Sequence, residues 1–159
     1  MQSFRHWRLS VVILLVAILA VAVGVAGANP PPKPVSGEFI VQSFPCDQGV
    51  GLCSAGQATG DLSGDVFVVI TSSSPSADGT LNNYTGTITI TRNNGTLSGT
   101  IAGSVTVPGG DLNSTVNFTD GTKKYRVRTG TLNVTGFFDF ATGAERDQYN
   151  GSIQVNPGR

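Results

Sequence analysis

The amino-acid sequence predicts an all-β domain that folds as a single closed antiparallel barrel behind an N-terminal signal helix. Three observations support this prediction. Apolar residues alternate with Thr, Ser and Asn along many short segments, glycines recur on the apolar side of those segments, and no helical periodicity follows the N-terminal region. Because the side chains of a strand point alternately to its two faces, each segment predicts a strand with one buried and one solvated face.

The N-terminal residues 1–28 have the pattern of a secretory signal peptide. A basic segment with Arg5 and Arg8 precedes an apolar run over residues 11–25, and small residues follow immediately before Asn29. We therefore predict cleavage before Asn29. The alternative is an uncleaved signal anchor, because the apolar run is long enough for one.

The domain begins after a spacer. Residues 29–34 read NPPPKP, which is typical of an extended, exposed linker. The barrel domain is predicted over residues 35–157. Export would place it outside the cell or on the extracytoplasmic surface, where only an uncleaved N-terminal segment would contact a membrane. The sequence leaves the oligomeric state open.

The composition excludes several classes of function. The only histidine, His6, lies in the signal segment, so the domain itself contains none. This excludes histidine-based acid–base catalysis, Ser-His-Asp or Cys-His nucleophiles and histidine-ligated metals, and we predict no metal or cofactor. Arg5 and Arg8 also precede the domain. The domain therefore has eight Lys and Arg residues against ten Asp and Glu residues, and its charges nearly balance. Such a charge gives no general attraction for nucleic acid, which is not a predicted partner.

Two cysteines, Cys46 and Cys53, lie in the segment after the first predicted strand, residues 35–44. In an exported domain such a pair most simply forms a disulfide. It would close a short loop and stabilise the fold by about 2–3 kcal/mol in the chain-entropy model. A redox pair is the alternative, but the spacing is not C-x-x-C.

Glycines mark bends and turns in the strands that are predicted after the cysteine-containing segment. Residues 57–71 predict a long second strand, and Asn94-Gly95 predicts a type I′ hairpin turn. That turn would place Ile88 opposite Ile101 and Gly86 opposite Gly103. Further strands are expected at residues 112–119, 130–140 and 145–155.

The last two strands form a second predicted hairpin. A turn at Thr142-Gly143 would place Tyr149 across from Gly136, where an aromatic ring can cover the missing side chain. The same register turns Glu145 and Asp147 toward the buried side.

Seven or eight such strands could close a barrel or stack as a sandwich. The glycine-centred motifs are unevenly spaced, which excludes a solenoid with a fixed period. Glycine on the concave face of almost every strand favours the barrel, because tightly coiled strands need small inward residues where they bend.

The residues also resemble a known family. The stretch DGTKKYRVRTGTLNVTGFFDFATG from Asp120, followed by YNGSI, and the segment TGDLSGD from Thr59 are similar to allene oxide cyclase barrel-like proteins, secreted bacterial relatives of plant allene oxide cyclases and dirigent proteins. This resemblance implies an eight-stranded antiparallel barrel and, as a function, isomerase or cyclase activity. It carries over no catalytic residue. The basic stretch from Lys123 departs from the small residues usual in that family.

Six aromatic residues are predicted to point into the barrel. They could line a cavity for a small apolar ligand, or they could simply fill the core, since an eight-stranded barrel has just enough interior for its own side chains. These candidates for ligand contact are Phe39, Tyr84, Phe118, Phe138, Phe140 and Tyr149.

Charged residues supply two further candidate sites. Lys124, Arg126 and Arg128 could bind an anion, or could form a solvated strand face that resists aggregation. Glu145 and Asp147 are the candidate acid–base pair, with the wet rim of a barrel as the alternative reading.

Three functional hypotheses follow. The first is a non-catalytic module that binds a small apolar or amphipathic ligand. The second is a cyclase or isomerase that acts by holding a flexible substrate in one conformation. The third is a structural or adhesive surface protein.

Overall fold

The computed structural model describes residues 31–125 and 127–155. The predicted signal peptide, the first residues of the spacer and Arg126 lie outside this range. The described chain contains eight strands and two short 3-10 helices: β1 (Lys33–Pro45), β2 (Leu52–Ala58), η1 (Gly60–Leu62), β3 (Gly64–Pro75), β4 (Leu81–Arg92), β5 (Gly95–Thr106), β6 (Asp111–Gly121), η2 (Lys123–Tyr125), β7 (Val127–Phe138) and β8 (Ala144–Val155).

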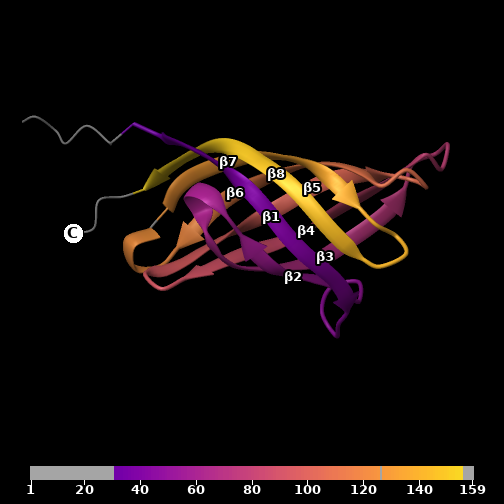
Figure 1. Ribbon diagram of the computed structural model, residues 1–159, viewed down its shortest axis with the longest axis horizontal. Helices are drawn as coiled ribbons and strands as arrows, with labels where there is room; N and C mark the ends of the chain where they lie inside the picture. Colours follow the sequence, from indigo (N-terminus) through magenta and orange to yellow (C-terminus); the bar gives the residue numbers. More distant parts are fainter. Residues whose placement is uncertain (1–30, 126, 156–159) are drawn as a thin grey trace, which may run out of the picture.

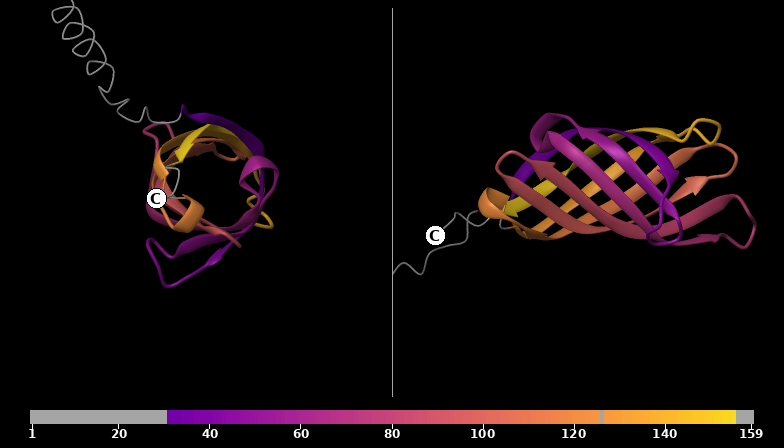
Figure 2. Two further views of the ribbon diagram at one scale, coloured as in Figure 1. Left: turned by 90° about the vertical axis from the view of Figure 1, so that its left-hand side faces the viewer. Right: turned by 90° about the horizontal axis from the view of Figure 1, so that it is seen from below.

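The strands form a closed barrel in which every strand pairs with the next one along the chain and β8 pairs with β1 (Figure 1). All pairings are antiparallel. Figure 2 shows the tilted strands from the side and the closed ring from one end. The prediction of an eight-stranded antiparallel barrel is confirmed, and a two-sheet sandwich is excluded because the sheet has no edge. None of the described helices is both long and apolar enough to span a membrane.

The strand that the sequence did not reveal is β2. Residues 57–71 were expected to form one strand, but β2 ends at Ala58 and β3 begins only at Gly64, after η1. The inward positions of β2 include Ser54 and Gly56, so this strand does not show the alternation of apolar and polar residues that predicts a strand. Closure of the barrel, rather than the pattern of β2 itself, brings this segment into the sheet.

The register of the β4–β5 hairpin differs from the predicted one by two residues. Ile88 lies opposite Gly99 and Gly86 opposite Ile101, so the turn falls on residues 93–94. A type I′ turn needs positive φ at both central residues, whereas the positive φ of +136° belongs to Gly95. A shift of two residues leaves every side chain on its predicted face, because the side-chain period is two.

The β7–β8 hairpin shows the same kind of shift. Residues 139–143 form its loop, and Asp139 holds the loop by accepting hydrogen bonds from the Ala141 amide (2.8 Å) and the Thr142 hydroxyl (2.7 Å). The prediction that Tyr149 covers Gly136 is wrong. Tyr149 instead lies across from Gly37 in β1, and Asp147 takes the place opposite Gly136.

One disulfide joins Cys46, in the β1–β2 loop, to Cys53, the second residue of β2. Cys53 is fully buried and pairs with Val69 of β3, so the bond ties the β1–β2 loop to the sheet. The predicted disulfide is confirmed.

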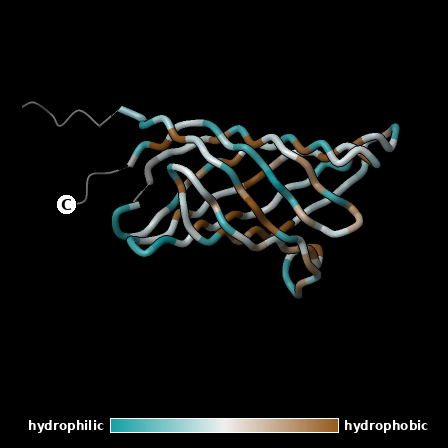
Figure 3. The backbone as a smooth tube through the Cα atoms, in the orientation of Figure 1, coloured by the Kyte–Doolittle hydropathy of each residue, from teal (hydrophilic) through white to brown (hydrophobic). Residues whose placement is uncertain are grey.

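Apolar and polar residues alternate along the strands, as the brown and teal segments of Figure 3 show. The apolar set faces inward. Its members are most completely buried in the half of the barrel next to η1 and η2, which we call the closed end. The buried side chains there are Val35, Leu62, Ile90, Leu97, Val116, Phe118, Leu132, Tyr149 and Ile153.

Tyr149 anchors the closed end. Its hydroxyl donates a hydrogen bond to the Thr59 carbonyl (2.6 Å) and accepts one from the Leu62 amide (2.9 Å). These bonds hold η1 across the barrel mouth, where Leu62 is buried. The second connection, η2, packs Tyr125 against the core, and the Arg92 guanidinium lies 5.1 Å from the centre of its ring.

Candidate functional site

A cavity of about 350 Å³ occupies the other half of the barrel. We call this half the open end; its loops are residues 46–51, 76–80, 107–110 and 139–143. Two side chains that line the cavity, Leu52 and Phe140, are 38% and 50% exposed, so the cavity communicates with solvent there. Its volume falls within the range of small-molecule sites.

The structure divides the six predicted aromatic residues into two groups. Phe39, Tyr84, Phe138 and Phe140 line the cavity. Phe118 and Tyr149 are only 2% exposed and belong to the packed core of the closed end. Phe39 connects the two regions, because its ring stacks on that of Tyr149 with 4.7 Å between centroids. The barrel is therefore filled by its own side chains in one half and hollow in the other.

Small inward side chains explain why the open half is hollow. The cavity wall includes the serines Ser43, Ser54, Ser73 and Ser114 at positions where the closed end has larger apolar residues. A bulge between Ile70 and Ser72 changes which residues of β3 face inward and brings Ser73 to the wall. Since the remaining lining is mainly Val, Ile and Leu, the space is apolar with a few polar groups on its wall.

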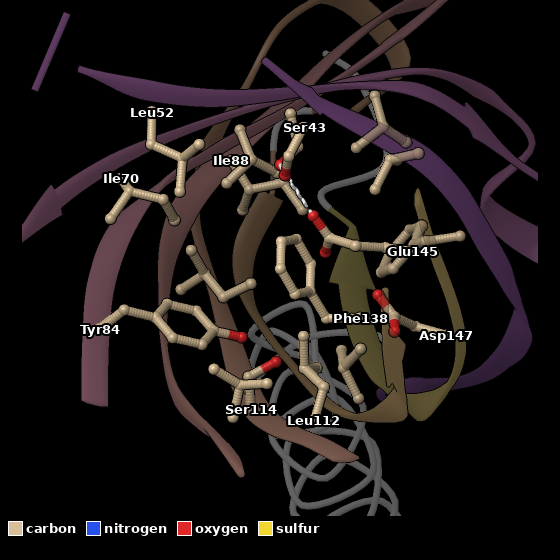
Figure 4. A pocket seen from close by; sticks show the side chains of 18 of the residues that line it. Ser43, Leu52, Ile70, Tyr84, Ile88, Leu112, Ser114, Phe138, Glu145 and Asp147 are labelled. Carbon is tan, nitrogen blue, oxygen red and sulfur yellow. Dashed lines mark hydrogen bonds between the residues drawn. The ribbon is translucent and has the colours of Figure 1, made fainter. Parts of the chain in front are cut away.

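Glu145 belongs to a cluster of hydrogen-bonded polar side chains on the cavity wall (Figure 4). Its Oε1 accepts hydrogen bonds from the Ser43 hydroxyl (2.6 Å) and the Ser54 hydroxyl (3.0 Å). The two serine oxygens lie 2.7 Å apart, so one of them can also donate to the other. Three neighbouring strands, β1, β2 and β8, contribute to this cluster.

Asp147 is the second inward carboxylate and is only 5% exposed. Its Oδ1 has no hydrogen-bond partner among the described residues. It fits against the barrel wall because residue 136 is glycine; a Cβ there would overlap Asp147 Oδ1 and the Arg146 carbonyl oxygen. The sequence predicted the inward direction of Asp147 but not this partner.

The pKa values of both carboxyl groups are raised. Burial raises the pKa of Asp147 from 3.8 to about 7, the negative charge of Glu145 adds to the rise, and a backbone hydrogen bond from Phe137 opposes it. Burial also raises the pKa of Glu145, against the hydrogen bonds from Ser43 and Ser54. Perturbed pKa values of this kind are common among carboxyl groups of functional sites.

Tyr84 faces the carboxylates from the other side of the cavity. Burial raises its pKa to about 12, with smaller contributions from Glu145 and Asp147. Its hydroxyl points toward Ser114, as Figure 4 shows, and the proximity of Ser114 opposes part of the rise. The buried Ser114 Oγ nevertheless has no partner that satisfies hydrogen-bond geometry. Two buried polar atoms on the cavity wall, Ser114 Oγ and Asp147 Oδ1, thus have no hydrogen-bond partner among the described residues.

The remaining predicted site residues lie elsewhere. Lys124 is exposed in η2 at the closed end, away from the cavity. Arg126 and the side chain of Arg128 lie outside the described residues. Glu38, a further carboxylate of β1, is on the outer face and accepts a hydrogen bond from Gln148. In residues 31–125 and 127–155, no group of three His, Cys, Asp or Glu side chains is arranged to hold a metal ion.

Sequence reasoning identified the aromatic and acidic residues but missed the serines. Ser43, Ser54 and Ser114 occupy inward positions of their strands, so their place on the apolar face was the available signal. A polar residue on an otherwise apolar face needs a partner when it is buried. Only the assembled barrel shows that Ser43 and Ser54 have one in Glu145 and that Ser114 does not.

No protein family, curated protein or solved structure matches this chain in the comparisons made with known proteins.

Proposed function

We propose that this protein is a binding module that holds a small apolar or amphipathic molecule in the open half of its barrel. The single observation that supports this proposal best is the cavity of about 350 Å³, walled by aliphatic and aromatic side chains and open to solvent beside Leu52 and Phe140. A pocket of this kind, with few convergent polar groups, is typical of small-molecule sites.

The unsatisfied polar atoms support the same proposal. A buried polar group without a partner costs free energy, so nearly all of them are paired in folded proteins. Ser114 Oγ and Asp147 Oδ1 have no partner among the described residues, and both residues line the cavity. A ligand with a polar group and an apolar body would form a hydrogen bond with an unpaired atom of the wall and fill the apolar space.

The proposed setting is extracytoplasmic. A disulfide is present in the domain, and disulfides persist mainly in oxidising compartments. The basic and apolar segments before Asn29 support export. A secreted or surface-exposed barrel that captures a small molecule fits both features.

Blocking the cavity tests the proposal. The probe is the neutral dye N-phenylnaphthylamine, whose fluorescence increases in apolar sites. Val105→Trp places a large ring inside the cavity, whereas the control Ala102→Trp places the same ring on the exposed face of the same strand. We expect the inward variant to lose at least about 90% of the dye signal and the outward variant to retain it. Equal binding by both variants would contradict a site inside the barrel.

A second candidate function is catalysis by an isomerase or cyclase of the allene oxide cyclase type. The observation that favours it is the pair Glu145 and Asp147, two carboxyl groups with raised pKa values on the wall of an apolar cavity. Such a pair can supply both an acid and a base, while the apolar wall holds a flexible substrate in one conformation.

Turnover measurements distinguish catalysis from binding alone. Product formation from unsaturated epoxides would be followed in the unmodified protein and in Glu145→Gln and Asp147→Asn. A role in proton transfer predicts a loss of about 100-fold or more in at least one variant, with dye binding retained. If both variants turn over substrate as fast as the unmodified protein, the carboxyl pair is not the catalytic group.

A further inference from the structure

Acidic residues surround the open end of the barrel. Three of the four loops at that end carry a carboxylate, namely Asp47, Asp78 and Asp139, and Asp111 begins β6 directly after the fourth loop. Glu145 and Asp147 lie inside, on the wall of the same cavity. Six carboxyl groups thus lie at or within one mouth of the barrel.

Within the described range, the positively charged side chains lie outside the cavity. Lys33, Lys123 and Lys124 are at the closed end, and Arg92 is at the end of β4 beside η1, where it donates hydrogen bonds to the Asp61 carbonyl and the Ser63 hydroxyl. Arg146, the third residue of β8, is near the open end, but its side chain is exposed on the outer face of the barrel. No Lys, Arg or His from the described chain lines the cavity. The two carboxylates inside therefore face no cationic side chain.

The structure assigns to this cavity a ligand class: we propose that it selects cationic amphiphiles, small molecules with an apolar or aromatic body and one protonated amine. This inference rests on the proposed binding function and adds the charge of the ligand to it. The ammonium group would lie against Asp147, and the apolar body would fill the space between Phe39, Phe138 and the aliphatic wall.

Three features of the site fit an ammonium group. Asp147 Oδ1 accepts no hydrogen bond from the described residues, and Asp147 is only 5% exposed. A charge-assisted hydrogen bond is the strongest partner for such an atom. The aromatic side chains of Phe39, Tyr84 and Phe138 line the same cavity, and a cation near such a ring is stabilised by cation–π attraction.

The mouth would also attract a cation from solution. Charges of one sign around a cleft with low-dielectric walls focus the field and raise the local concentration of counter-ions. An anionic ligand such as a fatty acid would meet the opposite effect, because no cationic side chain of the described residues lines the cavity to pair with it. The cavity should therefore reject the carboxylate analogue of a ligand that it binds as an amine.

The state of Asp147 makes this selectivity depend on pH. The titratable groups that face it are Glu145 on its own strand and Tyr84 across the cavity, while Tyr149 directs its hydroxyl to η1. The flanking strands β1 and β7 present only uncharged side chains to it, Phe39, Val41 and Phe138 among them. A protonated Asp147 offers an ammonium group no charge, so amine affinity should rise as pH increases through about 7.

Three probes with one apolar body and different charges test the inference. Naphthylmethylamine is cationic, naphthylmethanol neutral and naphthoate anionic at about pH 8. Calorimetric titration of the full chain at about pH 5 and about pH 8 would give the affinity of each. The variant is Asp147→Asn, and the matched control is Asp47→Asn, which removes an exposed carboxylate at the same end of the barrel.

We expect the amine to bind about 10-fold or more tightly than the alcohol at about pH 8, and naphthoate to bind more weakly than either. Asp147→Asn should bring the amine to the affinity of the alcohol and remove the pH dependence, while alcohol binding persists. The Asp47→Asn control should keep the preference for the amine. If alcohol and amine bind equally at about pH 8, the charge selectivity is overturned and the binding function stands; if neither binds, both proposals fail.

Discussion

The buried carboxyl group of Asp147 should make this barrel less stable as pH rises. Its pKa is about 7 in the folded chain, against 3.8 in the absence of the fold. Below about pH 4 both states carry the proton and there is no penalty. Between about pH 4 and 7 the unfolded chain releases the proton while the folded chain retains it, so the free energy of unfolding falls with increasing pH. Above about pH 7 the penalty is complete.

The size of the effect follows from the two pKa values. A difference of one pKa unit corresponds to about 1.4 kcal/mol, so a rise from 3.8 to about 7 corresponds to about 4 kcal/mol. The raised pKa of Glu145 acts in the same direction. Asp78, with a pKa lowered to about 2 by hydrogen bonds from Ser76 and Thr80, acts oppositely, but its stabilisation is complete above about pH 4 and is lost only in stronger acid. Stability should therefore be greatest near pH 4.

Asp147→Asn isolates the contribution of this side chain. Asparagine has nearly the same shape and never ionises, so the variant should gain up to about 4 kcal/mol over the unmodified protein at about pH 8 and about nothing at pH 4. Urea unfolding followed by far-UV circular dichroism at several pH values measures both quantities. Asp47→Asn controls for the loss of one negative charge at the open end. A difference between Asp147→Asn and the unmodified protein that is the same at every pH would refute the reasoning, because it would mean that burial does not oppose ionisation of Asp147.

Three further predictions concern stability. Tyr149→Phe should cost about 1–3 kcal/mol, because it leaves the Leu62 amide without its partner, and hydrogen exchange should show faster opening of η1. Gly37→Ala should cost about 1–3 kcal/mol in urea unfolding, because its Cβ would overlap the Thr59 carbonyl oxygen; Gly130→Ala, whose nearest contacts are side-chain atoms, should cost less. Replacing both cysteines with serine should lower the free energy of unfolding by about 2–3 kcal/mol, and a variant as stable as the oxidised protein would contradict a stabilising role for the disulfide.

Much of the fold could be predicted from the sequence because alternation decides which face a residue occupies. Both hairpin registers were displaced by two residues, yet Ile88, Ile101, Glu145 and Asp147 still point inward as expected. The side-chain period of a strand is two, so an error of two changes the partners and keeps the faces. The disulfide could also be predicted from the sequence, because two cysteines in one domain have a single possible pairing.

The candidate site was only partly predictable. Six aromatic residues were expected inside, but alternation says nothing about position along the barrel axis. Phe118 and Tyr149 pack into the closed end, whereas Tyr84 and Phe138 line the cavity. The tilt of strands around a barrel determines which inward residues share a level, and that depends on all eight pairings together.

The sequence by itself determined the class of fold, the inward direction of most apolar side chains and the absence of histidine chemistry, since each follows from local pattern or composition. Only the tertiary structure decided that the barrel is filled at one end and hollow at the other, because a cavity is what remains after side chains from many strands share one volume. It also decided that Asp147 lies against Gly136 with an unpaired oxygen. Partners of this kind come from the register between strands, which a single strand does not encode.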